Sequence, residues 1–195
     1  YNDKIVIASR HADSSTGSVY VYDANDLSAT PTKLTAFDGA ASDEFGIRVG
    51  VSNDKIVVGS RLDDDQGSDS GSVYVYDAND LSVTPTKLTA FDGAMGDNFG
   101  HFIAVSNDKI VVSSLYDDDK GNSSGSVYVY DANDLSATPT KLTAFDGVEN
   151  DLFGFAIAVS NDKIMVSAFN DDDQGSGSGS VYVYDANDLS ATPTK

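Results

Sequence analysis

Three aspartate triplets carry the clearest chemical signal in the sequence. They recur at intervals of 54 residues, each inside a loop rich in glycine and serine, and they comprise Asp63, Asp64, Asp65, Asp117, Asp118, Asp119, Asp171, Asp172 and Asp173. Carboxylates held close together repel one another, and a divalent cation that binds between them relieves this repulsion. The triplets are therefore candidate ligands for calcium, and the sequence indicates no other cofactor.

The other reactive side chains form no recognisable catalytic motif. His11 and His101 do not recur and have no motif beside them, and the chain has no cysteine. Near-identical repeats supply the same side chains in every copy, whereas catalysis normally needs one asymmetric constellation. We therefore expect no catalytic residues and a function in binding or adhesion. Because carboxylates are plentiful, a hydrolase or lyase that acts on polysaccharide is the first alternative, and a structural spacer is the second.

The charge of the chain limits its partners. It has 31 acidic and 12 basic residues, which gives a formal net charge of -19. Such a charge repels phosphate backbones and anionic lipid surfaces, so we expect no nucleic-acid partner. The longest apolar runs are only as long as a strand, which argues against insertion into a membrane. The acidic loops are compatible with a bound cation, with a basic protein partner, or with a solvated surface that has no site.

The triplets belong to a repeat that covers the whole chain. The segment Val-Tyr-Val-Tyr-Asp-Ala-Asn-Asp-Leu-Ser recurs every 54 residues, beginning at Val19, Val73, Val127 and Val181. Asn-Asp-Lys-Ile recurs almost as regularly, since only the first loop is three residues shorter. A unit of this length cannot bury both faces of a sheet alone, so it must pack against its neighbours. We expect one domain over residues 1–195, with repeats at 1–44 (partial), 45–98, 99–152 and 153–195 (partial).

Four strands are predicted within each period, and residues 45–94 illustrate them. Strand A (45–51) contains small residues, strand B (55–60) is β-branched, and strand C (72–77) alternates valine with tyrosine. Strand D (86–91) begins after Pro85 and carries Lys87, as an outer edge strand does. This order predicts an all-β protein, a β-propeller with four-stranded antiparallel blades. Tandem sandwiches need about 100 residues each, and the coils of a β-solenoid are usually shorter than this period.

The repeat resembles a known family. Phe-Gly, an alternating strand, a turn, a β-branched strand and Gly-Ser-Val-Tyr-Val-Tyr follow one another as in the FG-GAP repeat, the blade unit of integrin α-chain propellers and of many bacterial and algal surface proteins. The resemblance covers the whole chain and is most specific in Phe45, Phe99 and Phe153 of the Phe-Gly pairs and in Gly71, Gly125 and Gly179. It implies an integrin-like propeller that is extracellular or on the cell surface.

The sequence departs from this family at two places. The Gly-Ala-Pro that follows strand B is replaced by Gly-Ser-Arg, Ser-Ser-Leu and Ser-Ala-Phe, which end at Arg61, Leu115 and Phe169. The calcium loop between strands A and B is shortened to Ser-Asn-Asp-Lys, which leaves too few carboxylates to surround the ion. We therefore expect calcium to bind at the aspartate triplets and not in the A-to-B turn.

Successive loops of a four-stranded meander alternate between its two ends, so the B-to-C and D-to-A loops share one face, here named the acidic loop face. It carries 19 of the 31 acidic residues against Arg10, Arg61 and Lys120, a formal charge of -16. The lysines of every Asn-Asp-Lys and Thr-Lys are assigned to the opposite face. We expect a protein or glycan ligand to bind the acidic loop face, which is also the face that the resemblance to integrins implies.

The two ends of the chain predict open sheet edges. The sequence starts at strand B and stops before strand D, so a closed ring of four blades would lack two strands. Sheet proteins avoid such exposed edges. We expect this chain to be a window of a larger propeller of about six to eight blades, or to pair its open edges with neighbouring copies.

Overall fold

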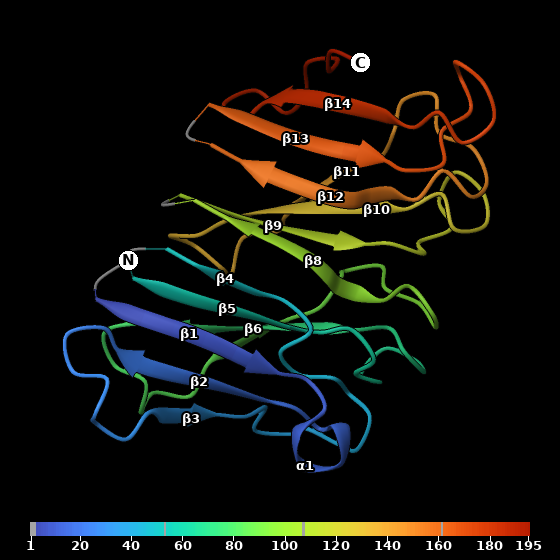
Figure 1. The fold of residues 1–195 in the computed structure, drawn as a ribbon. Coiled ribbons are helices and arrows are strands. Elements are labelled where there is room, and N and C mark those ends of the chain that lie inside the picture. Colours follow the sequence, from blue (N-terminus) through green and yellow to red (C-terminus); the bar gives the residue numbers. More distant parts are fainter. Residues whose placement is uncertain (1–2, 53, 107, 161) are drawn as a thin grey trace.

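The computed structural model describes residues 3–52, 54–106, 108–160 and 162–195. It is an all-β protein with 42% strand and four antiparallel sheets (Figure 1). The helix that the described residues contain, α1 (Ala12–Ser15), is a single turn in which Asp13 and Ser14 have positive φ angles of 53° and 62°. The predicted all-β class is therefore confirmed. The first residue of each Asn-Asp-Lys-Ile motif lies outside the described residues.

Each sheet is a meander of consecutive strands. Repeat 1 contains β1 (Lys4–Ser9), β2 (Ser18–Asp23) and β3 (Thr32–Leu34). Repeat 2 contains β4 (Val49–Val51), β5 (Lys55–Ser60), β6 (Ser72–Asp77) and β7 (Thr86–Leu88). Repeat 3 contains β8 (Phe99–Val105), β9 (Lys109–Ser114), β10 (Ser126–Asp131) and β11 (Thr140–Leu142). Repeat 4 contains β12 (Phe153–Val159), β13 (Lys163–Ala168) and β14 (Ser180–Asp185), and Thr194 pairs with Val183 where the other repeats have their last strand.

Strands B and C have the predicted bounds, whereas strand D is shorter than predicted. In repeat 2 it ends at Leu88 and not at residue 91. The backbone leaves the sheet there because the Thr89 carbonyl accepts a hydrogen bond from the Tyr130 hydroxyl of the next repeat, at 3.1 Å. Strand A reaches its predicted length in repeats 3 and 4, and in repeat 2 its paired part is β4 alone.

The four sheets follow one another in chain order, from the first at one end of the stack to the last at the other (Figure 1). The first strand of each sheet contacts the first strand of the next, since β1 lies against β4, β4 against β8, and β8 against β12. The opposite strand of each sheet, such as β7 or β11, forms an outer edge. This arrangement agrees with an open propeller segment whose A strands lie on the inner side.

The core lies between the sheets and not within them. One cluster joins Val19, Val21 and Leu34 of repeat 1 to Phe45 and Tyr74 of repeat 2, all of them buried. The Phe45 ring meets the Tyr74 ring edge to face, with centroids 5.4 Å apart. Equivalent clusters join repeats 2 and 3 and repeats 3 and 4. The tyrosines of strand C thus pack between blades.

The Phe-Gly pairs join each repeat to the one before it. Gly71 at the end of the B-to-C loop in repeat 2 forms a parallel bridge with Phe99 of repeat 3, whose backbone N–H donates to the Ser70 carbonyl at 2.9 Å. Gly17 with Phe45 makes the same bridge between repeats 1 and 2. The two most specific motifs of the repeat are therefore the two sides of one junction.

Candidate functional site

The B-to-C loop of each repeat is held by one lysine, and repeat 3 shows the geometry. Lys141 on β11 places its Nζ 2.8 Å from Asp92 Oδ2, 2.8 Å from Asp117 Oδ2 and 2.6 Å from Asp119 Oδ2. Asp117 and Asp119 belong to the aspartate triplet of the same repeat, whereas Asp92 lies in the segment that links repeat 2 to repeat 3. One ammonium group thus connects three carboxylates and two repeats. We name this arrangement the lysine clamp.

Tyr128 completes the lysine clamp. Its hydroxyl lies 2.6 Å from Asp92 Oδ1 and 3.3 Å from Asp117 Oδ2. The pairing of β10 with β11 sets Tyr128 beside Lys141, whose Nζ stands 5.3 Å from the centre of the ring. Ser126 donates to Asp117 Oδ1 at 2.9 Å. Both oxygens of the buried Asp117 therefore have partners within the protein.

The same clamp recurs in repeats 2 and 4. Lys87 binds Asp38, Asp63 and Asp65. Lys195 binds Asp146, Asp171 and Asp173. Repeat 1 has a reduced version in which Lys33 pairs with Asp13 at 2.7 Å and Ser18 donates to the same carboxylate. The clamp is a property of the repeat and not of one position.

The clamp corrects the charge assignment that the sequence suggests. The Thr-Lys lysines were expected on the face opposite the triplets, but they reach the acidic loop face and neutralise part of it. Moving these four lysines changes the formal charge of that face from -16 to -12. The assignment is wrong because a long side chain on the short outer strand leans toward the loop end of the blade.

The middle aspartate of each triplet has a different role from its neighbours. Asp118 Oδ1 accepts the backbone N–H of Ser123 at 2.8 Å and so closes the loop on itself. Asp64 and Asp172 accept the backbone N–H groups of Asp69 and Gly177 in the same way. The first and third aspartates of each triplet therefore pair with the lysine, whereas the second binds the backbone of its own loop.

Calcium at the triplets stays a prediction. Within the described ranges, no group of three or more histidine, aspartate or glutamate side chains is arranged to hold a metal ion. In the lysine clamp the ammonium group takes the place between the carboxylates that a cation would need. The triplets fit a divalent ion only if this lysine moves away, because its ammonium group already lies between the carboxylates and would repel a second cation there.

The electrostatics of the clamp favour its charged form. Burial tends to raise the pKa of Asp92, but hydrogen bonds from Lys141 and Tyr128 outweigh burial and hold that pKa below its usual value. Burial tends to lower the pKa of Lys141, but the three carboxylates raise it well above its ordinary value. Burial and the neighbouring Asp92 raise the pKa of Tyr128 far beyond the physiological range. At neutral pH the clamp is therefore an ion cluster with a neutral tyrosine.

Replacing Tyr128 by phenylalanine tests the hydroxyl of the clamp. The ring stays in its buried contact with Phe99, but Asp92 and Asp117 each lose a donor. We expect a loss of about 1–3 kcal/mol in the free energy of unfolding, because a buried acceptor loses its partner. Urea unfolding measures it. Tyr22→Phe is the control, since Tyr22 is only half buried and lies in the incomplete first repeat. Equal losses in both variants would contradict a role for the clamp.

A second set of carboxylates lies just below the acidic loop face. Asp43, Asp97 and Asp151 are buried, and each accepts a backbone N–H three residues earlier, such as Ala94 N for Asp97 at 2.8 Å. Burial, with a further contribution from Asp117 and Asp118, raises the pKa of Asp97 to about 6. Asp97 thus holds its proton more tightly in the folded protein than in the unfolded chain.

This raised pKa predicts that Asp97→Asn increases the stability of the protein by an amount that depends on pH. Above pH 6 ionised Asp97 costs stability, and the cost disappears as the pH falls from about 6 toward 4 because the folded state takes up the proton first. We expect Asp97→Asn to stabilise the protein by about 1–3 kcal/mol at pH 7 and by less at pH 4. Thermal unfolding across this range measures the difference. Asp134→Asn, at an exposed turn, is expected to bring no gain in stability. A stability difference between Asp97→Asn and wild type that stays constant with pH would refute the explanation.

The two histidines lie in different surroundings. His11 is exposed and accepts a hydrogen bond from Arg10 Nε at 3.2 Å. His101 in β8 is buried, and its Nδ1 has no hydrogen-bond partner among the described residues. Sequence inspection gave no role to either one, because neither recurs.

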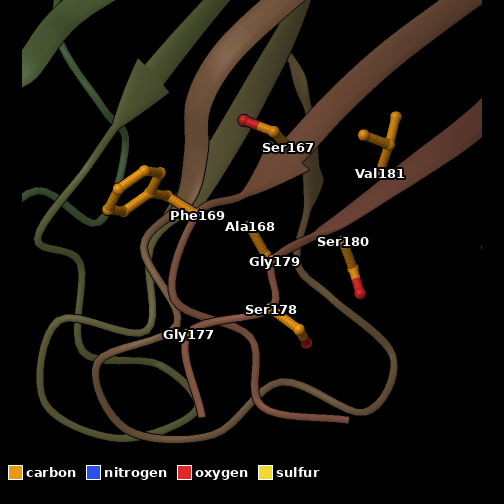
Figure 2. Close-up of a pocket in the computed structure, with 8 residues that line it drawn as sticks. All are labelled: Ser167, Ala168, Phe169, Gly177, Ser178, Gly179, Ser180 and Val181. Carbon is orange, nitrogen blue, oxygen red and sulfur yellow. The ribbon is translucent and has the colours of Figure 1, made fainter. Parts of the chain in front are cut away.

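A hollow of about 380 Å³ in repeat 4 is lined by residues that include Phe169, Gly177, Gly179 and Val181 (Figure 2). In repeats 2 and 3 the corresponding glycines, Gly71 and Gly125, contact the Phe-Gly pair of the following repeat. The hollow is therefore shaped like one half of a blade junction. The expectation that open sheet edges bind neighbouring copies stays a prediction.

Comparison with known proteins agrees with this architecture. The family model of the FG-GAP repeat matches residues 30–76, 84–130 and 138–184. Each match contains the outer strand of one sheet together with three strands of the next sheet, so it spans a complete junction. A search of the curated proteins finds no match. No helix in the described part of the chain is both long and apolar enough to cross a membrane. The matched segments cover most of the chain, which belongs to the FG-GAP repeat family.

Proposed function

We propose that this chain is a non-catalytic extracellular module that serves adhesion or the assembly of a surface or matrix, and that it binds its ligand through the acidic loop face. FG-GAP repeats are typical of extracellular and surface proteins, which supports the location. The ligand is a protein or a glycan, bound at several equivalent points. The observation that carries the proposal is an exposed aromatic residue that recurs beside the lysine clamps of repeats 2, 3 and 4.

One exposed aromatic residue recurs beside every lysine clamp. Phe37, Phe91 and Phe145 are 58%, 57% and 55% exposed, and each meets the clamp tyrosine of the next repeat edge to face. An aromatic ring kept in water at the same place in three repeats offers apolar contact area beside fixed charges. Equivalent weak contacts on one rigid body add up to strong binding when the ligand is also repetitive.

The clamp also argues against acid catalysis by its carboxylates. A glycosidase needs one carboxyl group with a raised pKa as its proton donor. Burial tends to raise the pKa of Asp92 and Asp146, but the clamp lysine and tyrosine hold it below its usual value in both. Asp97 is the observation that favours the polysaccharide-acting alternative, since its pKa is about 6. Its carboxylate is nevertheless buried and binds the Ala94 backbone.

A glycan array and a protein-binding screen, together with a hydrolysis screen, test the proposal. We expect binding without turnover, and we expect Phe91→Ala with Phe145→Ala to weaken binding about tenfold or more, as loss of two aromatic anchors does. Val83→Ala is the matched control, because Val83 is exposed on the opposite loops and the other repeats carry alanine there. Turnover that Asp97→Asn abolishes would establish an enzyme instead. Absence of any ligand would favour the structural spacer.

Calcium binding at the triplets is tested by titration calorimetry. Replacing Asp117, Asp118 and Asp119 together by asparagine is expected to weaken calcium binding, because asparagine carries no charge to attract the ion. Asp108→Asn in the A-to-B turn of the same repeat is expected to leave the affinity unchanged. Equal losses of calcium affinity from both changes would show that the triplet loop is not the specific binding site of the ion.

A further inference from the structure

The chain has three arginines, and all of them gather at one place although they are far apart in sequence. Arg10 follows β1 and Arg61 follows β5, at equivalent positions of repeats 1 and 2. Glu44 Oε2 lies 2.9 Å from Arg61 Nε and 3.9 Å from Arg10 NH1. Arg48, just before β4, is close enough that the other two guanidinium groups add to burial in lowering its pKa. We name these four residues the arginine site.

The arginine site has more positive than negative charge in a protein that is otherwise strongly acidic. Two of its three guanidinium groups lie near the Glu44 carboxylate, whereas Arg48 makes no ion pair with any described residue and donates to the Ile47 carbonyl at 2.9 Å. Its guanidinium carbon stands 4.5 Å from the centre of the Phe102 ring. Guanidinium groups held together repel one another, and an oxyanion that accepts two parallel hydrogen bonds from them relieves this repulsion. The site therefore favours a ligand with a carboxylate or sulfate group.

His101 lies beside the arginine site, since its ring stacks on Phe102, over which Arg48 stands. It is 91% buried between Phe102 and Tyr116, with centroid distances of 5.0 Å and 6.0 Å. Its Nδ1 is buried without a hydrogen-bond partner among the described residues. A buried polar atom without a partner is costly, and such atoms are rare in folded proteins. Arg48 and Arg61 lie close enough to help burial lower the pKa of this imidazole to about 4.

Aromatic rings continue from the arginine site across repeats 3 and 4. Phe102 lies 5.5 Å from Phe155, and Phe155 stacks on Phe169 at 4.5 Å. Tyr116, Phe155 and Phe169 are 39%, 36% and 54% exposed. We name Phe102 and these three residues the aromatic shelf. Its partly exposed rings offer apolar contact area next to the arginines.

We propose that the arginine site and the aromatic shelf together bind an acidic glycan, with the arginines holding a carboxylate or sulfate group and the aromatic rings packing against the sugar that carries it. Arg10 and Arg61 belong to the acidic loop face, but the site contains none of the exposed phenylalanines that carry the function proposed above, so different variants test the two proposals. Nucleic acids and anionic membranes carry similar oxyanions, but the net charge of -19 opposes their extended negative surfaces.

The repeats themselves supply matched variants. Arg61 corresponds to Leu115, Arg48 to Ala156, Tyr116 to Leu62 and Lys120 to Gln66, so each substitution copies a residue that another repeat already carries. Titration calorimetry of the full chain would use oligogalacturonate, its methyl ester, a sulfated oligosaccharide and poly-glutamate. We expect wild type to bind the uronate or the sulfated oligosaccharide, and not the methyl ester or poly-glutamate.

We expect Arg61→Leu and Arg48→Ala each to weaken glycan binding at least about tenfold. We expect Tyr116→Leu to weaken it about threefold or more, while Lys120→Gln and Val83→Ala leave it unchanged. Arg61→Leu leaves the Glu44 carboxylate without its ion pair and could lower the stability of the fold. Arg48→Ala still tests the site in that case, because Arg48 is exposed and makes no ion pair with a described residue.

Three results would overturn the inference. If the protein bound neither acidic glycan, the proposed site would not exist. An equal loss from Lys120→Gln would show general charge attraction instead of a site. Tight binding of poly-glutamate that Tyr116→Leu leaves unchanged would indicate an acidic peptide as the ligand.

Discussion

Replacing Lys141 by methionine is expected to lower the free energy of unfolding by about 3–5 kcal/mol, the cost of leaving a buried ion cluster without its counter-charge. Methionine keeps most of the volume of the side chain but leaves Asp92, Asp117 and Asp119 to repel one another, and the side chain of Asp117 is only 4% exposed. Because Asp92 belongs to the preceding linker, the junction between repeats 2 and 3 should loosen first. Urea unfolding followed by tyrosine fluorescence measures the loss.

Lys109→Met is the control for this prediction. Lys109 pairs with Asp108 at 3.5 Å near the surface, where such pairs contribute about 0–1 kcal/mol. The pH dependence gives a second check. In wild type the lowered pKa of Asp92 contributes stability that is full above the unfolded value and is lost as the pH falls through the folded value. The difference between wild type and Lys141→Met should therefore be largest at neutral pH and shrink below pH 4. Similar losses for both lysines would refute the clamp.

The same variant connects the clamp with the predicted calcium site. Without the ammonium group, Asp117, Asp119 and Asp92 are free to accept another cation. We expect millimolar calcium to restore part of the stability of Lys141→Met and to stabilise wild type less, since a ligand stabilises the state that it binds. No difference between the two proteins would count against the triplets as metal ligands.

The strands were predictable from sequence because their signal is local. Alternating β-branched residues bounded by turn residues define β5 and β6 to the residue. The end of β7 was not predictable, because it depends on a hydrogen bond from Tyr130 in the next repeat. Contacts between repeats decide such boundaries, and the sequence of one period does not contain them.

The candidate site was predictable only in part. The triplets were visible as acidic residues, but their partner depends on the pairing of Tyr128 with Lys141, which sets the lysine beside the loop. One signal was present, since every clamp lysine follows its linker aspartate by 49 residues. The arginine site left a weaker signal, because Arg10 and Arg61 are equivalent in only two repeats, Glu44 and Arg48 do not recur, and only the fold brings the four together.

Replacing Gly71 by alanine is expected to destabilise the protein by about 3–6 kcal/mol, since the change combines backbone strain with a clash at a blade junction. Gly71 has a φ of +86°, and a Cβ atom there would stand 2.1 Å from the Phe99 carbonyl oxygen and 2.5 Å from its nitrogen. Both atoms are backbone, so no side chain can rotate away. The bridge between repeats 2 and 3 must therefore open, and with it the hydrogen bond from Phe99 to Ser70.

Gly96 separates these two contributions. Its φ of +89° nearly equals that of Gly71, but a Cβ atom there has no described heavy atom within 4 Å. Gly96→Ala should therefore cost only the strain of a left-handed residue, about 1–2 kcal/mol. Thermal and urea unfolding of both variants, with hydrogen exchange at the Phe99 amide, measure the difference. Equal costs would mean that Gly71 is required only for its backbone angle. A larger cost at Gly71, with faster exchange at Phe99, would show that glycine is required there because the next blade packs directly against it.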